Sequence, residues 1–405
     1  MANVHSRPGR VLSGMRPTGR LHLGHYHGVL KNWLQLQTEY DCFFFVADWH
    51  ALTTHYETPW VVGDNVWDMV IDWLACGINP KLARLFIQSR VPEHAELHLL
   101  LSMITPLGWL ERVPSFRDQQ EQLGDRDLST YGFLGYPTLQ AADVLIYKAT
   151  EVPVGEDQVA HLELTREIAR RFNHLYGRER DFEEKAQEAA RKMGKKNARL
   201  YHDLRRRYQE AGDDEALEVA HALLRDQPNI TVADRERLYG YLDGSTRELL
   251  PEPDVLLTPT AKMPGLDGRK MSKSYDNTIG LREPTDEVTR KLRTMPTDPA
   301  RVRRNDPGTP EKCPVWDLHK VYSDERTQAW VQEGCTTAGI GCLECKRCII
   351  DAVEAELAPI REQARELEQD PEQVRSIVIS GCEQAREEAR ETLSEVRSAM
   401  GLEYR

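Results

Sequence analysis

Two histidines flank a glycine close to the start of the chain. They are His22 and His25, in the run His22-Leu23-Gly24-His25. A glycine has no Cβ to keep a ligand away, and a helix that starts here would offer unpaired N–H groups and a positive dipole end to an anion. The two imidazoles could then donate hydrogen bonds to phosphate oxygens as negative charge builds on them. Alone, a run of four residues is a weak signal.

A basic pentapeptide, Lys270-Met271-Ser272-Lys273-Ser274, follows about 250 residues later. Its lysines and hydroxyls, with the glycines of residues 264–269 before them, could form a mobile clamp on a leaving pyrophosphate. An isolated pentapeptide of this kind is more often a solvated loop. The two motifs in this order rarely occur together by chance, so together they predict a site for ATP chemistry.

Five of the eight cysteines lie between residues 313 and 348. They are Cys313, Cys335, Cys342, Cys345 and Cys348. In a reducing compartment such clustering indicates metal ligation before disulfides. Four thiolates over this span could hold structural zinc or a 4Fe–4S cluster, and zinc is the more frequent occupant of four-cysteine sites.

Buried strands and amphipathic helices alternate through the first 180 residues. Residues 42–47 and 85–87 predict strands, whereas residues 25–36 and 62–75 predict helices with one apolar face. This alternation predicts an α/β fold with a doubly wound parallel sheet that is covered on both faces. Residues 11–14 resemble the end of an earlier strand. The histidine motif falls between that strand and the helix predicted over residues 25–36.

The pattern along the chain predicts three parts. Residues 1–177 and 250–284 form the α/β domain. Residues 178–249 are charge-dense, rich in Ala and Leu and without strand signals, which predicts a helical insertion. Residues 285–405 form an all-helical domain that carries the clustered cysteines.

The 405 residues have 53 Lys and Arg against 65 Asp and Glu, a net charge of −12. Fibrous and wholly disordered classes are excluded by this composition, and the acidity argues against a broad basic surface. The charge is uneven, however: residues 191–207 hold eight Lys and Arg against one acid, and residues 290–304 hold six against one. Because local patches decide phosphate contacts, nucleic acid stays open as a partner.

The sequence gives no sign of a membrane or secretory segment. No apolar run approaches the ~20 residues that a membrane span needs. The N-terminal residues lack an apolar core and a small-residue cleavage site. We therefore expect a cytoplasmic protein with no membrane partner.

Three further stretches complete a family pattern: residues 136–143 (YPTLQAAD), 152–158 (VPVGEDQ) and 258–265 (TPTAKMPG). With the histidine and lysine motifs, they resemble the class I aminoacyl-tRNA synthetases, specifically the bacterial tryptophanyl-tRNA synthetases. The match covers nearly everything except the insertion. The resemblance implies a Rossmann-like catalytic domain, a helical anticodon-binding domain and a homodimer. It implies activation of L-tryptophan by ATP and Mg²⁺, with release of pyrophosphate, and transfer to tRNA(Trp).

The resemblance implies a tryptophan pocket around Asp143. An indole N–H only donates and a carboxylate only accepts, so a pocket built on this pair rejects analogues that lack the donor. The apolar neighbours of Asp143 favour a pocket over an exposed helix face. The implied tryptophan-binding residues are Asp143, Tyr136, Gln140, His50, Val152, Val154 and Gln158.

The resemblance also implies a nucleotide site in which residues 155–157 hold the ribose and Met263 lies along the adenine. Arg117 stands where a phosphate-contacting lysine is usual, and Arg16 replaces a common glutamine. Catalysis would be positioning and charge stabilisation, because the carboxylate of the amino acid is itself the nucleophile. The implied catalytic residues are His22, His25, Lys270, Lys273 and Arg117. The implied ATP-binding residues are Arg16, Pro17, Thr18, Gly24, His25, Gly155, Glu156, Asp157, Met263, Lys270, Met271, Ser272, Lys273 and Ser274.

Residues 334–346 resemble the subset of bacterial tryptophan enzymes that carry a 4Fe–4S cluster beside the anticodon-binding helices. The resemblance therefore places the cluster ahead of zinc. Its implied ligands are Cys313, Cys335, Cys342 and Cys345, and Cys348 is spare.

Two questions remain open at this point. Residues 297–308 are the candidate for anticodon-stem contacts, whereas a tRNA role for the basic run 191–207 competes equally with a solvated helix face. The alternatives to a ligase are a small-molecule nucleotidyltransferase and a non-catalytic tryptophan-sensing or RNA-binding paralogue. Both signature motifs are intact here, and non-catalytic paralogues tend to lose them.

Overall fold

The computed structural model divides into two compact units. The first, the sheet unit, comprises Met1–Thr165 and Pro253–Arg390; the second, the helical unit, comprises Arg166–Glu252 and Glu391–Arg405. The domain boundaries predicted from the sequence stay predictions. The residues that the structure describes are 9–112, 130–155, 158–177, 181–243, 248–257 and 263–404.

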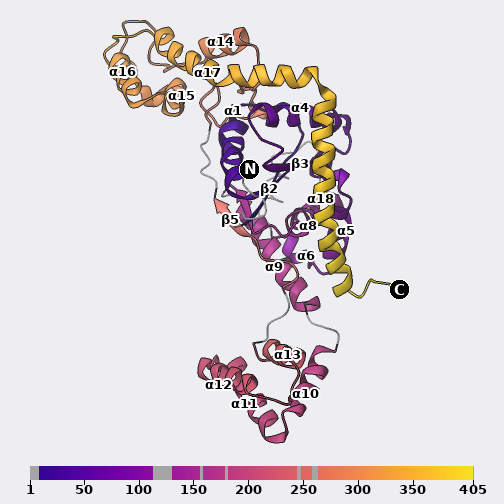
Figure 1. Cartoon of the computed structure of the whole chain (residues 1–405). Helices are drawn as coiled ribbons and strands as arrows, with labels where there is room; N and C mark the ends of the chain where they lie inside the picture. The colour runs from indigo at the N-terminus through magenta and orange to yellow at the C-terminus, as the bar shows by residue number, and fades with distance from the viewer. Residues whose placement is uncertain are drawn as a thin grey trace. The chain divides into compact units, whose positions relative to one another are not determined.

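Five parallel strands form the centre of the sheet unit (Figure 1). Their order is β3-β2-β1-β4-β5, so the chain winds outward in two directions from β1. The predicted doubly wound parallel sheet is confirmed. The strands are β1 (Arg10–Met15), β2 (Asp41–Val46), β3 (Ala83–Ile87), β4 (Glu151–Val154) and β5 (Asp254–Leu257).

Neighbouring phenylalanines of β2 show that helices cover both faces of the sheet. Successive side chains of a strand point to opposite faces. The ring of Phe44 stacks on Trp33 of α2 (Lys31–Glu39) at 4.2 Å, and Trp73 of α4 (Trp60–Ala75) meets Trp33 edge-on at 5.1 Å. On the other face, Phe43 stacks on Tyr147, which ends α8, at 4.7 Å.

The remaining elements of the first half position the motifs. The predicted helix over residues 25–36 is interrupted, because residues 26–30 form a π-helical turn between α1 and α2. Such turns are rare and frequently occur at functional sites. The elements are α1 (Leu23–His25), η2 (Tyr26–Leu30), α3 (Asp48–His55), η3 (Gln88–Arg90), α5 (Glu93–Ser102), α6 (Leu107–Leu110), α8 (Tyr131–Ile146) and α9 (Val159–Tyr176).

Helices dominate after residue 284, as predicted. The long helix α18, yellow in Figure 1, packs so closely on the sheet that a Cβ at Gly381 would collide with the carbonyl of Leu85. Arg386 and Arg390 of α18 both donate to Glu93, at the start of α5. The elements are η5 (Lys273–Tyr275), α14 (Thr285–Thr294), η6 (Pro310–Lys312), α15 (Pro314–Tyr322), α16 (Glu325–Thr336), α17 (Cys342–Gln369) and α18 (Pro371–Ala399).

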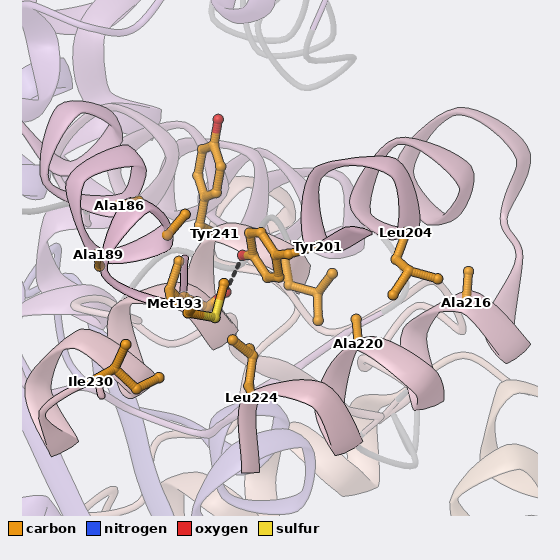
Figure 2. Packing of buried hydrophobic residues seen from close by; sticks show 13 residues of the cluster. Ala186, Ala189, Met193, Tyr201, Leu204, Ala216, Ala220, Leu224, Ile230 and Tyr241 are labelled. Carbon is orange, nitrogen blue, oxygen red and sulfur yellow. Dashed lines mark hydrogen bonds between the residues drawn. The ribbon is translucent and has the colours of Figure 1, made fainter. Parts of the chain in front are cut away.

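The helical unit has an apolar core of its own, built from small and branched side chains (Figure 2). Tyr201 is buried in it and donates its hydroxyl to the carbonyl of Leu238 at 2.6 Å. Buried alanines such as Ala189 and Ala220 let the helix backbones approach closely. The helices around this core are α10 (Phe182–Lys192), α11 (Lys195–Ala211), α12 (Asp214–Arg225) and α13 (Val232–Asp243).

Within the described ranges, no helix combines the length and the apolar character that a membrane crossing requires.

Candidate active site

A cavity of about 450 Å³ lies at the point where the strand order reverses between β1 and β4. Gly14 of β1, Ala47 after β2 and Gly155 after β4 line it, so it opens at the carboxyl ends of the strands. Ligands of doubly wound sheets bind at this position. All seven side chains predicted to bind tryptophan line the cavity, namely His50, Tyr136, Gln140, Asp143, Val152, Val154 and Gln158.

The carboxylate of Asp143 is the most heavily hydrogen-bonded group of the cavity wall. Its Oδ2 accepts from Nε2 of His50 at 2.7 Å, and its Oδ1 accepts from Nδ1 of His94 at 2.6 Å. The amide nitrogen of Gln88 donates to both oxygens, at 2.8 and 3.0 Å. Asp143 is only 1% exposed, so these donors replace the water that an exposed carboxylate would have.

These contacts keep Asp143 ionised. Burial alone would raise the pKa of the carboxyl, but the hydrogen bonds from His50 and His94 outweigh burial and lower the pKa to about 2. Because an ionised carboxylate only accepts, both histidines must carry a proton on the nitrogen that faces it. The site therefore presents a fixed acceptor to a ligand.

Gln88 and His94 were missed in the sequence. Gln88 directly follows β3, and His94 lies in the first turn of α5. Neither belongs to a motif, and their separations from Asp143 are 55 and 49 residues. The one available signal was that a polar residue follows a predicted strand at the end where such sheets bind ligands.

The histidine motif folds as its own helix cap. Nδ1 of His22 accepts from the backbone N–H of Gly24 at 3.1 Å, and Nδ1 of His25 accepts from that of His22 at 3.2 Å. With Nδ1 as acceptor, each neutral ring carries its proton on Nε2. A Cβ at Gly24 would lie 2.8 Å from the His22 ring, so only glycine fits.

The lysine motif lies against the histidine motif. His22 and Gly280 form an antiparallel bridge, and the backbone N–H of Leu23 donates to the carbonyl of Ile279 at 3.0 Å. Burial first, and then the charge of Lys273, lower the pKa of His22 to about 4. Both rings are therefore neutral donors at pH 7, beside a lysine charge.

A buried asparagine, also missed in the sequence, holds the lysine loop in shape. Oδ1 of Asn277 accepts from the backbone N–H of Ser272 at 2.7 Å, and its Nδ2 donates to Asp267 at 2.7 Å. A Cβ at Gly265 would collide with the Asn277 amide, which explains the glycine in this loop. Fixing the loop backbone fixes where Lys273 can reach.

The other predicted nucleotide residues are distributed unevenly. Arg16 lines the cavity with Gly155, and Pro17 and Thr18 continue the loop from Arg16. Met263 is buried, and its carbonyl accepts from the backbone N–H of Met271. Lys270 and Ser274 are exposed. Arg117, Glu156 and Asp157 lie outside the described residues.

The clustered cysteines come together at the start of α17. Burial first, and then the thiols of Cys313, Cys335 and Cys342, raise the pKa of Cys345 to about 12. Nε2 of His319 lies 3.2 Å from Sγ of Cys345. In the part of the chain that the structure describes, no three His, Cys, Asp or Glu side chains lie close enough together to hold a metal ion.

The basic run of the helical unit uses much of its charge locally. The guanidinium of Arg205 lies 3.8 Å over the ring of Tyr241 and donates to its carbonyl. Arg206 pairs with Asp203, and Arg207 pairs with Asp213. These three arginines therefore favour the solvated, locally balanced helix face over a tRNA contact.

A doubly wound sheet, a cavity at its switch point and paired histidine and lysine motifs define the catalytic unit of a class I aminoacyl-tRNA synthetase. Comparison with known families gives the same class. The family described as tRNA synthetases class I (W and Y) matches residues 5–201 and 225–358.

Individual relatives narrow the family further. A tryptophan–tRNA ligase of Ralstonia nicotianae is 65% identical over 98% of this chain and 99% of its own. That of Thermotoga maritima is 45% identical over 98% and 100%. The solved tryptophanyl-tRNA synthetase of Campylobacter jejuni, complexed with ADP and tryptophan, superposes with a TM-score of 0.73 at 26% identity, over 97% of this chain and 99% of that one. The chain belongs to the tryptophanyl-tRNA synthetase family.

Proposed function

We propose that the protein is a tryptophan–tRNA ligase that uses ATP and Mg²⁺. One observation carries the proposal: Lys273 and two neutral histidines lie together in the sheet unit, whose cavity has Asp143 in its wall. Tryptophan would lie in the cavity with its indole N–H toward Asp143. Its carboxylate would then face the α-phosphate of ATP.

The chemistry needs no nucleophile from the protein. The tryptophan carboxylate attacks the α-phosphorus, the bond to the bridging oxygen breaks, and pyrophosphate leaves. The Nε2–H groups of His22 and His25 and the charge of Lys273 stabilise the negative charge that develops there. Mg²⁺ supplies further charge neutralisation on the phosphates. A ribose hydroxyl of tRNA(Trp) then attacks the adenylate carbonyl and releases AMP.

Tryptophan-dependent exchange of ATP and pyrophosphate tests the proposal. We expect exchange with L-tryptophan and none with L-tyrosine, followed by esterification of tRNA(Trp). Exchange with tyrosine alone would overturn the amino-acid specificity. Tryptophan binding without exchange would instead favour the alternative, a non-catalytic sensor or RNA-binding paralogue.

We also propose that Cys313, Cys335, Cys342 and Cys345 hold a 4Fe–4S cluster. Four neighbouring thiols are the donor set that such a cluster takes. The thiols of Cys313, Cys335 and Cys342 lie near enough to Cys345 to raise its pKa, so the four share one neighbourhood, as cluster ligands must.

The cluster proposal is tested by metal analysis and visible absorbance of protein purified without oxygen. We expect about four iron atoms per chain, retained in Cys348→Ala and lost in Cys345→Ala. Cys348 is the matched control because it neighbours the site without belonging to the four ligands. Stoichiometric zinc without iron would overturn the cluster.

A homodimer is the further assembly that we propose. Leu99, Met103, Leu107 and Tyr131 are each more than half exposed, on the adjoining elements α5, α6 and α8. Exposed apolar patches of this kind mark interaction surfaces, and most soluble oligomers pair the same patch twice. Light scattering should show a dimer that Met103→Glu disrupts, whereas Val232→Glu, an exposed apolar residue of the helical unit, should leave it intact.

For tRNA contacts we propose the loop that precedes the cysteines, in the region assigned to the anticodon-binding domain, residues 285–405. Arg303 and Arg304 are exposed there, whereas Arg301 is buried and donates to the carbonyls of Arg304 and Ile340. Arg303→Ala should weaken tRNA binding and reduce its salt slope by about one charge. We propose the cytoplasm as the place of action.

A further inference from the structure

The Asp143 carboxylate is held from behind by side chains that do not reach the cavity. Gln88, His94 and Tyr147 are each 0% exposed, and none of them lines the cavity. The members of this hydrogen-bond network that do line the cavity are Asp143 itself and His50. The rear contacts therefore cannot bind tryptophan directly, and any effect they have on it must pass through Asp143.

The network continues behind Asp143 to a buried tyrosine. Asp143 only accepts, so Nδ1 of His94 carries the proton that points to it. The other ring nitrogen of His94, Nε2, is hydrogen-bonded to the hydroxyl of Tyr147 at 2.7 Å. The hydrogen bonds therefore link Tyr147 through His94 to Oδ1 of Asp143.

Gln88 completes the support from a different element. Its single amide nitrogen spans both carboxylate oxygens, which fixes the plane of the carboxylate as well as its position. Its own carbonyl oxygen is buried and finds no hydrogen-bond partner among the described residues. An unsatisfied buried carbonyl costs stability. The position of Gln88 therefore costs folding free energy, and what it supplies in return is the orientation of the Asp143 carboxylate.

The contacts on Asp143 divide into a rear group and one contact on the cavity side. A carboxylate offers about four acceptor directions. His94 takes one from behind, and the amide nitrogen of Gln88 contacts both oxygens from behind. The remaining contact comes from His50, which lines the cavity together with Asp143, so an indole N–H would reach the carboxylate on the side of His50.

We propose that Gln88 is a specificity-determining positioning residue for tryptophan, with His94 as its partner. The amide of Gln88 turns the Asp143 carboxylate so that one of its oxygens meets the indole N–H. The inference rests on the proposed function, because it concerns the same pocket. It adds residues that touch neither tryptophan nor ATP and yet set which amino acid is accepted.

Gln88→Met tests this with two substrates, L-tryptophan and its analogue β-(3-benzothienyl)-L-alanine, in which sulfur replaces the indole N–H. We expect the KM for tryptophan to rise about 30-fold, with kcat within about twofold, because the indole contact is made equally before and during the reaction. The KM for the analogue should stay within about twofold, since the analogue has no donor for the acceptor that is lost. Discrimination between the two should therefore fall about 30-fold.

Gln37→Met is the matched control. Gln37 is also a buried glutamine, and its amide serves the backbone of Gly77 and Asn79 instead of a carboxylate. Gln37→Met should lower the melting temperature as Gln88→Met does, and it should leave the discrimination between tryptophan and the analogue unchanged. If Gln88→Met does not fold, Gln88→Asn serves as the second variant. It keeps the amide but shortens its reach, so it should lower discrimination by a smaller factor.

Two failures are distinguishable. If the wild-type protein shows no tryptophan-dependent exchange, the proposed function itself is wrong. If the wild type is active and Gln88→Met raises both KM values equally, or changes only the melting temperature, Gln88 is merely structural and this inference is overturned.

Discussion

Each unit of the molecule buries one tyrosine completely, and the two tyrosines use their hydroxyls differently. The hydroxyl of Tyr147 in the sheet unit is hydrogen-bonded to His94, which in turn donates to a carboxylate in the cavity wall. Tyr201 of the helical unit donates to the carbonyl of Leu238, among alanines and leucines (Figure 2). Burial alone does not distinguish the two tyrosines. Their hydrogen-bond partners distinguish them, because one chain of hydrogen bonds leads to the cavity and the other ends at a backbone carbonyl.

The same contrast holds for buried carboxylates. Asp143 collects three donors and still lines a cavity. Asp234 of the helical unit accepts from Lys192 and from Thr231, at the start of α13. Both partners belong to the helical unit, Thr231 at the start of the same helix and Lys192 in α10, so Asp234 caps α13 and joins it to a neighbouring helix. This difference can be tested with matched pairs of variants.

The largest expected effect comes from the two carboxylates. Asp143→Ala removes the indole acceptor and leaves three buried donors without a partner, so kcat/KM for tryptophan should fall by about 10³-fold. Asp234→Ala should cost about 1–2 kcal/mol of helix capping and leave exchange intact. Pyrophosphate exchange and urea unfolding measure the pair. Equal losses of exchange activity in Asp143→Ala and Asp234→Ala would contradict this difference between the two carboxylates.

Two lysines give the next largest contrast. Lys273→Ala removes the charge beside His22 and His25, which should lower kcat for exchange about 10²-fold while tryptophan binding is kept. Lys192→Ala removes a half-exposed ion pair with Asp234, which contributes at most about 1 kcal/mol. Steady-state kinetics and equilibrium dialysis with tryptophan separate kcat from binding. A loss of tryptophan affinity in Lys273→Ala would contradict a role confined to the phosphates.

Acid should destabilise the sheet unit through His22. The pKa of His22 is about 4 in the folded protein and about 6.5 in an unfolded chain, so between these values only the unfolded chain binds the proton. Stability is therefore full above pH 6.5 and is lost as the pH falls toward 4, with about 2 kcal/mol lost between pH 7 and pH 5 from this residue. Below that window, Asp143 adds a second loss as the pH approaches 2.

Tryptophan fluorescence isolates this effect, because all eight tryptophans belong to the ranges of the sheet unit. Urea unfolding followed by fluorescence should lose stability from pH 7 to pH 5, and His22→Gln should lose about 2 kcal/mol less over the same range. An unchanged slope in the variant would mean that His22 is not the group responsible.

The smallest effect separates the two tyrosines. Tyr147→Phe and Tyr201→Phe each remove one buried hydrogen bond, for about 1 kcal/mol of stability. Only Tyr147→Phe should also raise the KM for tryptophan, by about threefold, because His94 loses the hydrogen bond that orients it. If Tyr201→Phe changes this KM as much, the two chains of hydrogen bonds are equivalent.

Local patterns predicted the sheet, from apolar runs such as that of β2, and singled out the two motifs, residues 22–25 and 270–274. The side chains of the cavity were instead implied by the resemblance to the family, because no local pattern brings His50 and Asp143 together. Gln88 and His94 escaped because their role exists only once η3, α5 and α8 pack together. The charges of Arg205, Arg206 and Arg207 were counted correctly, but a count cannot show that each is already engaged within its own unit.

The docking of α18 on the sheet also sets the order in which the protein can fold as it is synthesised. Glu388 pairs with Arg10 of β1, and Gly381 lies on the backbone of β3, across almost the whole length of the chain. Closing such long loops is slow and must await the synthesis of α18. The helices α10–α13 pack on one another and share their own apolar core, so they can fold before α18 has been made.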